Sequence, residues 1–353
     1  MKAFVTGGSG FIGRSLIRQL IERGYEVQAL ARSANSANSV NLLGAQVTPG
    51  DITDKQSMRA GMAGSDVVFH VAAWYEIGSR DWMAAERINV GGTRNVLTLA
   101  RELGIPKVVY TSTVGVFSDT HGAMVDEGYY TDGPFLSEYE RTKWLAHYKV
   151  ALPLIRQGAP IIIVMPGGVY GPGDQSVIAQ LMRLFVKGAP ALPGPETTFT
   201  FAHVDDVAAG HILAAEKGRI GESYILAGPA IPLDELVDLC ANLSGLRRPR
   251  WHIPAAVLRP TAPLMRSLAR FAPVPTLFSD EAIRSLGATY TAGAAKARLE
   301  LGWETRPVEE GMRETLEWIR QTTPASPRPM PVLVGAAVGA AAGLWAARRW
   351  SQH

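Results

Sequence analysis

A tyrosine and a lysine lie four residues apart in the segment Tyr139-Glu140-Arg141-Thr142-Lys143. On a helix, this spacing places both side chains on one face, one turn apart. A lysine ammonium beside a phenol favours the phenolate, so we expect the pKa of Tyr139 to fall from about 10 toward neutral pH. Such a tyrosine can exchange a proton with a substrate oxygen while a hydride moves to or from the adjacent carbon. The pair alone is weak evidence, because many helices carry it on a solvated face.

A glycine-rich segment, Thr6-Gly7-Gly8-Ser9-Gly10-Phe11-Ile12-Gly13, lies between the first expected strand and the first expected helix. Its glycines follow Gly-x-x-Gly-x-x-Gly rather than the Gly-x-Gly-x-x-Gly of other dinucleotide-binding folds. Glycine allows a tight turn, and a helix N-terminus offers amides and a positive dipole to a pyrophosphate. Because strand and helix flank the segment in the required order, the sequence predicts a nucleotide site formed by Gly7, Gly10, Phe11, Ile12 and Gly13.

The end of the second expected strand indicates which dinucleotide binds. Folds that prefer NAD usually place an Asp or Glu there to hold the ribose hydroxyls. This chain has Leu30-Ala31-Arg32-Ser33 instead, and a guanidinium would pair with the additional phosphate of NADP. The alternative is that Arg32 is merely exposed. The sequence therefore favours NADP(H) as the cofactor, with NAD(H) as the second candidate.

Short apolar strands alternate with helical patterns through the first two thirds of the chain. Expected helices cover residues 12–23 and 88–103, and a glycine follows each as a stop. Expected strands lie at residues 4–6, 26–30, 47–48, 67–71, 108–110 and 161–165. The last strand has no polar alternation, which is typical of a strand covered on both faces. The alternation predicts an α/β fold with a Rossmann-type, doubly wound parallel sheet.

The second half of the chain is less regular, and we expect a smaller, partly helical substrate-binding region there. The predicted divisions are a Rossmann domain over residues 1–170, with core strands continuing to about residue 230, and a substrate region over residues 171–322, interleaved with the last core elements. Expected helices lie near residues 233–242 and 255–271.

The stretch from Trp251 to Phe278 is apolar but contains Arg259, Arg266 and Arg270. Ordinary packing with one solvated face explains this composition. A flexible lid, or a surface that faces lipid, is the alternative.

Composition excludes several classes of protein. The chain has 353 residues, 47% of them hydrophobic, and a formal net charge of +3, so it can bury a large core and gives little support to nucleic-acid binding. Cys240 is the only cysteine, which rules out an intramolecular disulfide and a cysteine-based metal site. We predict no metal. The cysteine usage suits a reducing compartment and no signal peptide is recognised, so we expect a cytoplasmic catalytic domain.

The C-terminal end differs from the rest of the chain. A Pro-rich linker over residues 323–329 leads into an uncharged segment from Met330 to Ala347, which Arg348 and Arg349 follow. Its 18 residues are at the lower limit for a membrane-spanning helix. Glycines recur in it every four residues, as in closely packed membrane helices. We expect residues 330–347 to anchor the protein to a membrane, and a loosely structured Ala/Gly-rich tail is the alternative.

Together, the motifs resemble those of the extended short-chain dehydrogenase/reductases, also called the NAD-dependent epimerase/dehydratase family. The resemblance covers about residues 1 to 320. Besides the glycine loop and the Tyr139/Lys143 pair, its motifs are Gly50-Asp51-Ile52, His70-Val71-Ala72-Ala73, Asn89-Val90-Gly91-Gly92-Thr93, Tyr110-Thr111-Ser112-Thr113, Pro166-Gly167-Gly168-Val169-Tyr170-Gly171-Pro172-Gly173-Asp174, His203-Val204-Asp205-Asp206-Val207-Ala208 and Leu301-Gly302-Trp303. Within this pattern His203, Asp205 and Asp206 would be structural rather than metal ligands or acid/base groups.

The resemblance implies roles for individual residues. Thr113 would be the catalytic hydroxyl with Ser112 beside it, Tyr139 the acid/base, and Lys143 a partner of both the phenol and the nicotinamide ribose. The further cofactor-binding residues that it implies are Asp51 and Ile52 at the adenine, Val71, Ala72 and Ala73 along the diphosphate-ribose path, Asn89 nearby, and Pro166 and Val169 beside the nicotinamide.

Several details look closest to a dihydroflavonol-4-reductase-like and 3β-hydroxysteroid dehydrogenase-like branch, notably an aromatic residue after His70-Val71-Ala72-Ala73. That branch implies an NADP-dependent oxidoreductase acting on the carbonyl or secondary alcohol of an apolar small molecule. The substrate would be a dihydroflavonol-, steroid- or terpenoid-like ketone, or an aldehyde. The resemblance also implies a homodimer built through two sheet-flanking helices.

An NAD-dependent nucleotide-sugar epimerase is the alternative function, because removing and returning a hydride needs no further residue. Dehydratases of the family usually carry an acid next to the hydroxyl motif. Here Val114-Gly115 follows Thr113, which disfavours elimination. A non-catalytic nucleotide sensor is a third interpretation, but such relatives commonly lose the tyrosine or the lysine, and this chain keeps both.

Overall fold

The computed structural model describes residues 1–78, 81–269 and 274–323 of the chain. These residues fall into two compact units. The first consists of Met1–Gly171, Phe199–Ala230 and Thr289–Val308, and the second of Pro172–Thr198, Ile231–Ala288 and the chain from Glu309 onward. The predicted anchor at residues 330–347, and all but the first residue of the predicted linker, lie outside the described residues. Within the described ranges, none of the helices combines the length and the apolar composition that a bilayer crossing requires.

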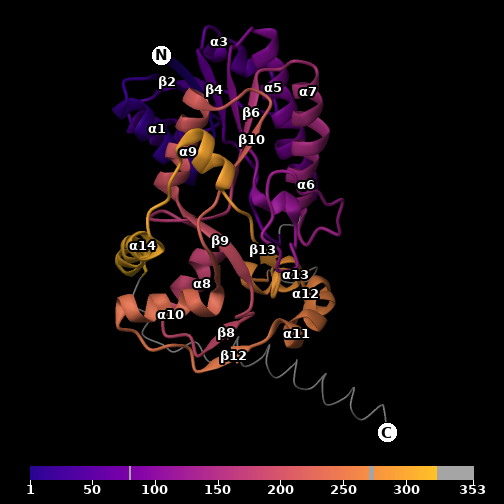
Figure 1. The fold of residues 1–353 in the computed structure, drawn as a ribbon, viewed down its shortest axis with the longest axis vertical. Helices are drawn as coiled ribbons and strands as arrows, with labels where there is room; N and C mark the ends of the chain where they lie inside the picture. The colour runs from indigo at the N-terminus through magenta and orange to yellow at the C-terminus, as the bar shows by residue number, and fades with distance from the viewer. Residues whose placement is uncertain (79–80, 270–273, 324–353) are drawn as a thin grey trace. The chain divides into compact units, whose positions relative to one another are not determined.

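A seven-stranded parallel sheet forms the centre of the first unit (Figure 1). Its strand order is β3-β2-β1-β4-β5-β6-β10, and each neighbouring pair is parallel. Every residue of β6 is buried, as expected for a strand covered on both faces. The strands are β1 (Lys2–Thr6), β2 (Glu26–Ala31), β3 (Gln46–Pro49), β4 (Val67–His70), β5 (Val108–Thr111), β6 (Ile161–Pro166) and β10 (Ser223–Leu226). This order confirms the predicted Rossmann-type, doubly wound fold.

Helices cover both faces of this sheet. In Figure 1, α1 and α9 lie on one side of it, and α5, α6 and α7 lie on the other. The helices of this unit are α1 (Phe11–Glu22), α2 (Ala34–Asn41), α3 (Arg59–Met62), α4 (Trp82–Glu86), α5 (Thr93–Glu102), α6 (Glu138–Trp144), α7 (Leu152–Arg156) and α9 (Val204–Lys217), with the short helical turns η1 (Gln56–Met58), η2 (Arg87–Gly92), η3 (Val114–Phe117), η4 (Leu145–Ala151) and η7 (Ala297–Leu301). Because α6, η4 and α7 follow one another without a gap, residues 138–156 form one continuous helical segment.

A second, smaller sheet contains β7 (Gly168–Tyr170), β9 (Thr198–His203), β11 (Ala230–Pro232) and β13 (Thr289–Tyr290). In it β7 pairs in parallel with β9. β7 begins two residues after β6 ends, so the chain leaves the large sheet and enters the small one almost at once.

The second unit is mainly helical. Its elements are α8 (Val177–Val186), α10 (Leu233–Ser244), α11 (Ala255–Leu258), η5 (Arg259–Thr261), α12 (Ala262–Leu268), η6 (Thr276–Phe278), α13 (Asp280–Ser285), α14 (Val308–Thr322) and the parallel strands β8 (Ala191–Pro193) and β12 (Trp251–Ile253). The helical segment predicted near residues 255–271 is present over residues 255–268, where α11, η5 and α12 follow one another without a gap. Pro260 and Pro263 lack a backbone N–H, and the tighter turn η5 lies at this point.

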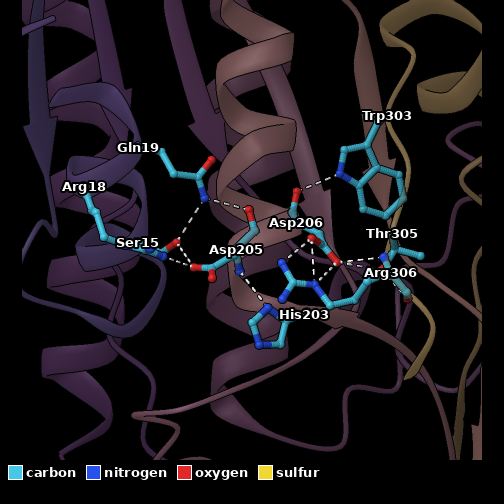
Figure 2. A network of polar contacts seen from close by, with 9 residues as sticks. All are labelled: Ser15, Arg18, Gln19, His203, Asp205, Asp206, Trp303, Thr305 and Arg306. Carbon is cyan, nitrogen blue, oxygen red and sulfur yellow. Dashed lines mark hydrogen bonds and ion pairs between the residues drawn. The ribbon is translucent and has the colours of Figure 1, made fainter. Parts of the chain in front are cut away.

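Asp205, at the start of α9, ties that helix to α1 (Figure 2). Its carboxylate accepts hydrogen bonds from the Ser15 hydroxyl and from the Arg18 guanidinium, the latter at 2.5 Å. The Gln19 amide donates to the backbone carbonyl of Asp205 at 2.8 Å. These contacts hold the helix that follows the glycine loop against α9.

Asp206 ties the same end of α9 to the chain near residue 306 (Figure 2). The Arg306 guanidinium donates to the carboxylate at 2.9 and 3.1 Å, and the Arg306 backbone N–H donates at 2.9 Å. The Trp303 indole donates to the Asp206 carbonyl at 2.7 Å. Both aspartates are thus engaged in structural contacts. In the described part of the chain, no three His, Cys, Asp or Glu residues are grouped as metal ligands.

Candidate active site

The predicted cofactor residues follow the carboxyl ends of neighbouring strands of the large sheet. Because these strands are parallel and adjacent, their carboxyl ends share one edge, where ligands bind in open α/β folds. The residues at this edge are Gly7, Gly10, Phe11, Ile12 and Gly13 after β1, Arg32 after β2, Asp51 and Ile52 after β3, Val71, Ala72 and Ala73 after β4, and Ser112 and Thr113 after β5. Pro166 is the last residue of β6, and Val169 lies in β7. The topology therefore gathers residues from six separate segments of the sequence.

The loop after β1 has the form of a pyrophosphate cradle. Gly7 has a φ of +75°, and a Cβ atom at this position would lie 2.5 Å from the backbone nitrogen of Ala72. A Cβ atom at Gly13 would lie 2.1 Å from the Gly7 carbonyl oxygen. Only glycine fits at either position. Gly10 is the N-cap of α1, no side chain caps this end of the helix, and its first turn carries no acid, so its amides suit an anion.

The residues after β2 and β3 differ in their surroundings. Arg32 directly follows β2 and is exposed, so its guanidinium can meet a ligand at the edge. The Asp51 carboxylate accepts from the backbone N–H and the hydroxyl of Thr53, both at 2.8 Å. Ile52 is buried and packs on Gly92. The positions of Asp51 and Ile52 are thus fixed by contacts within the protein.

Asn89 positions the loop after β4. Its Oδ1 accepts from the backbone N–H of Trp74 at 2.7 Å, and its Nδ2 donates to the Trp74 carbonyl at 3.1 Å and to the Thr142 hydroxyl at 2.9 Å. The side chain is almost fully buried. Asn89 therefore links the residue after Val71–Ala73 to the helix that carries Tyr139.

Three consecutive hydroxyl residues lie at the end of β5 and just after it, and two of them bond to buried histidines. The Thr111 hydroxyl lies 2.8 Å from Nε2 of His211 in α9. The Ser112 hydroxyl lies 2.8 Å from Nδ1 of His147 in η4. Burial lowers the pKa of both imidazoles, to about 4 for His211 and to about 3 for His147. Both rings are therefore neutral at neutral pH. His211 fixes the Thr111 hydroxyl to α9, and His147 fixes the Ser112 hydroxyl to η4.

The third hydroxyl, that of Thr113, meets the phenol of Tyr139 in a side-chain hydrogen bond. It also accepts from the Gly115 backbone N–H at 3.0 Å, which orients it. Among the three hydroxyls, Thr113 is the one paired with Tyr139. The resemblance assigned the catalytic role to the same residue.

Lys143 is buried on the helix that carries Tyr139. Its Nζ donates to the Thr111 carbonyl at 2.7 Å and lies 5.1 Å from the centre of the Tyr110 ring. Burial lowers the pKa of Lys143 to about 7. A large share of this amine is therefore uncharged at neutral pH.

The pKa of Tyr139 differs from the expectation drawn from its spacing to Lys143. Burial raises it to about 12, and the hydrogen bond with Thr113 offsets only part of that rise. The predicted lowering is wrong because desolvation disfavours the phenolate and also disfavours the lysine charge that would stabilise it. Tyr139 is therefore protonated at neutral pH and can act as a proton donor.

Tyr75 stands beside this phenol. The two ring centres are 4.8 Å apart and the ring planes are nearly perpendicular, at 88°, which is a favourable edge-to-face arrangement. About half of the Tyr75 side chain is exposed. It forms an aromatic wall next to the Tyr139 phenol.

Glu140 is a buried carboxyl group that holds this part of the structure together. It accepts hydrogen bonds from the Leu136 backbone N–H, the Ser118 hydroxyl and the Tyr290 phenol, each at 2.9 Å. Burial raises the pKa of Glu140. The carboxyl therefore fixes the start of α6 to the turn after β5 and to β13.

The positioning histidines were missed in the sequence. His147 lies one further helical turn beyond Tyr139 and Lys143, so the recurrence of polar residues at 139, 143 and 147 was the signal that could have found it. His211 is 100 residues from the Thr111 hydroxyl that it contacts, and no local pattern indicates that pair.

Comparison with known proteins agrees with this arrangement. Residues 3–227 match the model of the NAD dependent epimerase/dehydratase family. The chain is 34% identical to a 4-hydroxy-2-methyl-3-oxo-4-farnesyl-3,4-dihydroquinoline-1-oxide ketoreductase of Stigmatella aurantiaca, over 94% of this chain and 99% of that protein. It is 30% identical to sterol demethylase protein B of Methylococcus capsulatus, over 91% of this chain and 99% of that protein.

Solved structures show the same fold. The structure of gox2253 is similar with a TM-score of 0.79 and 32% identity, covering 90% of this chain and 98% of that one. A dTDP-glucose 4,6-dehydratase from Streptomyces venezuelae has a TM-score of 0.74 at 23% identity, covering 91% of this chain and 98% of that one. At that identity the likeness extends to the fold alone.

Thr113→Val tests which hydroxyl takes part in turnover. It removes the hydroxyl that meets Tyr139 and keeps the branched shape, so we expect kcat to fall by about 10²–10³. Thr113→Ser, which restores a hydroxyl, should recover most of that loss. The matched control is Ser112→Ala, which leaves His147 without its partner and should lower the free energy of unfolding by about 1–3 kcal/mol while retaining most turnover. Steady-state kinetics measures kcat, and chemical denaturation measures the free energy of unfolding. A larger loss of kcat in Ser112→Ala than in Thr113→Val would exclude Thr113 as the hydroxyl that takes part in turnover.

Proposed function

The chain belongs to the NAD dependent epimerase/dehydratase family, and we propose that it is an NADP-dependent reductase of an apolar ketone or aldehyde. It is an oxidoreductase of the short-chain dehydrogenase/reductase type, in keeping with relatives named as reductases and dehydrogenases. Family members whose structures contain NAD place a nicotinamide dinucleotide in this fold. The preference for NADP(H), the role of Tyr139 and the substrate class are the proposal.

The protonated state of Tyr139 is the observation that carries the proposal. When a carbonyl is reduced, its oxygen becomes a strong base, and the group beside it must give a proton. With a pKa of about 12, the Tyr139 phenol holds that proton at neutral pH and is more acidic than an aliphatic alcohol. The Thr113 hydroxyl has a single proton, which it can turn from the phenol to the substrate oxygen when a substrate binds. Both groups suit the direction of reduction.

The remaining residues of the edge bind and position. A bound nicotinamide cofactor would supply the hydride. The loop from Gly7 to Gly13 would hold its pyrophosphate, and Arg32 would pair with the phosphate on the adenine ribose. Lys143 fixes the helix of Tyr139 through the Thr111 carbonyl, and its pKa of about 7 lets it return a proton toward the phenol at neutral pH.

The apolar substrate class has two supports. Tyr75 places an aromatic ring against the phenol, so a substrate oxygen that reaches Tyr139 also passes an apolar wall. Two of the relatives are named for a farnesyl dihydroquinoline oxide and for a sterol. We propose a ketone or aldehyde of comparable polarity, bound with the help of the region over residues 171–322.

A nucleotide-sugar epimerase would use Tyr139 in the opposite order. Epimerisation begins with removal of a hydroxyl proton, which needs a phenolate or another base at that position. Because the same phenol would then return the proton in the second half of the reaction, Tyr139 could serve either activity. The names of the relatives, which include a ketoreductase, favour the reductase over the epimerase.

Tyr139→Phe tests the proton donor. We expect kcat to fall by about 10²–10⁴ because the ring remains and the proton is lost. The affinity for NADPH should stay within about twofold, since Tyr75 and the buried helix keep their packing partner. NADPH oxidation with a panel of apolar ketones and fluorescence titration of NADPH measure the two quantities. Tyr75→Phe is the matched control and should keep turnover. Wild-type kcat in Tyr139→Phe would exclude the role of this phenol.

Arg32→Asp tests the choice of cofactor. Loss of a charge-assisted hydrogen bond to the extra phosphate should weaken NADPH binding by about 10- to 100-fold, and the new carboxylate should accept from the NADH ribose instead. Competition titrations with NADPH and NADH measure the ratio of affinities. The control is Arg23→Asp. Arg23 is exposed and lies at the C-terminal end of α1, away from the glycine loop, so this change should leave the ratio of affinities unchanged. An unchanged ratio in Arg32→Asp would contradict the proposed NADP site.

A further inference from the structure

Residues 247–268 of the second unit, which we call the arginine-rich surface, combine exposed apolar side chains with cations. The sequence contains no Asp or Glu between Asp238 and Asp280. The same interval contains six arginines, at positions 247, 248, 250, 259, 266 and 270. The net charge of the whole chain is only +3, so this interval is strongly basic relative to the rest.

Large apolar side chains of this surface face solvent rather than the core. Trp251 in β12 is 62% exposed and Val257 in α11 is 49% exposed. Leu264 and Leu268 in α12 are 41% and 46% exposed. Because these two leucines are four residues apart on a helix, they share one face. In Figure 1, β12, α11 and α12 follow one another along one border of the second unit.

The arginines of the surface differ in their carboxylate partners. Arg248 pairs with Asp234 at 3.0 Å and with Asp238. The Arg266 guanidinium lies at 4.0 Å from Asp280, which is a weak ion pair on an exposed side chain. Within the part of the chain that the structure describes, neither Arg250 nor Arg259 has a carboxylate partner. The Arg250 guanidinium lies 5.7 Å from the centre of the Trp251 ring.

We propose that the arginine-rich surface docks on a bilayer that contains anionic lipids. Trp251 and the leucines of α12 would enter the region between headgroups and acyl chains, where amphipathic rings and apolar side chains are stabilised. Arg250, Arg259 and Arg266 would pair with lipid phosphates. Charge complementarity identifies this occupant, because an acid-free interval of 41 residues suits a negatively charged surface.

The form of the segment agrees with shallow docking. α11, η5 and α12 form one helical run over residues 255–268, which can lie along an interface and is too short to cross a bilayer. Docking would also place the enzyme next to a membrane-partitioned substrate. That last consequence rests on the proposed function, whereas the docking itself does not.

Vesicle binding by the full-length protein tests this proposal. Sedimentation with phosphatidylcholine vesicles is compared with sedimentation with vesicles that contain about one third phosphatidylglycerol. We expect binding to the anionic vesicles to be at least about tenfold tighter at low salt, and to weaken as salt screens the charges. Sedimentation does not measure turnover, so a failure of vesicle binding and a failure of the reductase proposal are distinguishable.

Paired variants locate the binding surface. The double variant Arg259→Gln with Arg266→Gln should weaken binding to anionic vesicles by about 30-fold. Each cation near an anionic membrane surface contributes about 1 kcal/mol of binding free energy, and the variant removes two. Leu264→Ser with Leu268→Ser should weaken it by about tenfold or more. The matched control is Arg298→Gln with Leu299→Ser in η7 of the first unit, where Leu299 is 87% exposed. The control should bind like the wild type, and all variants should keep their thermal unfolding temperature and NADPH affinity.

Three results would overturn the proposal. In the first, the protein binds neutral and anionic vesicles equally, and both double variants still bind. The membrane contact would then be assigned to residues 330–347. A loss of thermal stability in the leucine variant, with unchanged vesicle binding, would show that another part of the chain covers this surface. A change from dimer to monomer in the variants, again with unchanged vesicle binding, would make the surface an interface with a second copy.

Discussion

The hydrogen bond from buried Lys143 to the Thr111 carbonyl is the contact on which the site depends. It joins the helix of Tyr139 to the end of β5, and so brings the phenol to the Thr113 hydroxyl. The contact needs a donor long enough to reach from the helix to the strand end. It also requires the amine to leave water, and this desolvation lowers its pKa to about 7. The burial of Lys143 against the Thr111 carbonyl therefore sets both the position of the Tyr139 helix and the pKa of the amine.

Burial also explains why the surroundings of the phenol carry little charge. The pKa of His70 and that of His147 both fall to about 3, mainly by desolvation and further through the nearby Lys143. The pKa of Glu140 is raised and that of Tyr139 rises to about 12. At neutral pH the two imidazoles and the phenol are therefore neutral. A negative charge that develops on a substrate oxygen is then met by the proton of the phenol, which is the demand of carbonyl reduction.

The sequence predicted the fold well because its signals are local. Strand–helix alternation and helix-ending glycines placed six strands of the large sheet within one or two residues. The Tyr139/Lys143 pair was also visible, since four-residue spacing is a local property. The direction of the Tyr139 pKa shift was not, because it depends on burial by residues distant in the chain. The helical segment after Ala255 was predicted, and the tighter turn inside it was predictable in principle, since Pro260 and Pro263 stand in the sequence.

The identity and exchange of the nucleotide in purified protein test the central claim most directly. A reductase must release its oxidised cofactor after each turnover, whereas an epimerase takes the hydride back. We expect protein that arrives mostly free of nucleotide, binds NADPH far more tightly than NADH, and transfers deuterium from deuterated NADPH to a product alcohol. Protein that arrives with NAD, does not exchange it, and gives no net transfer of deuterium would exclude the reductase and favour the epimerase.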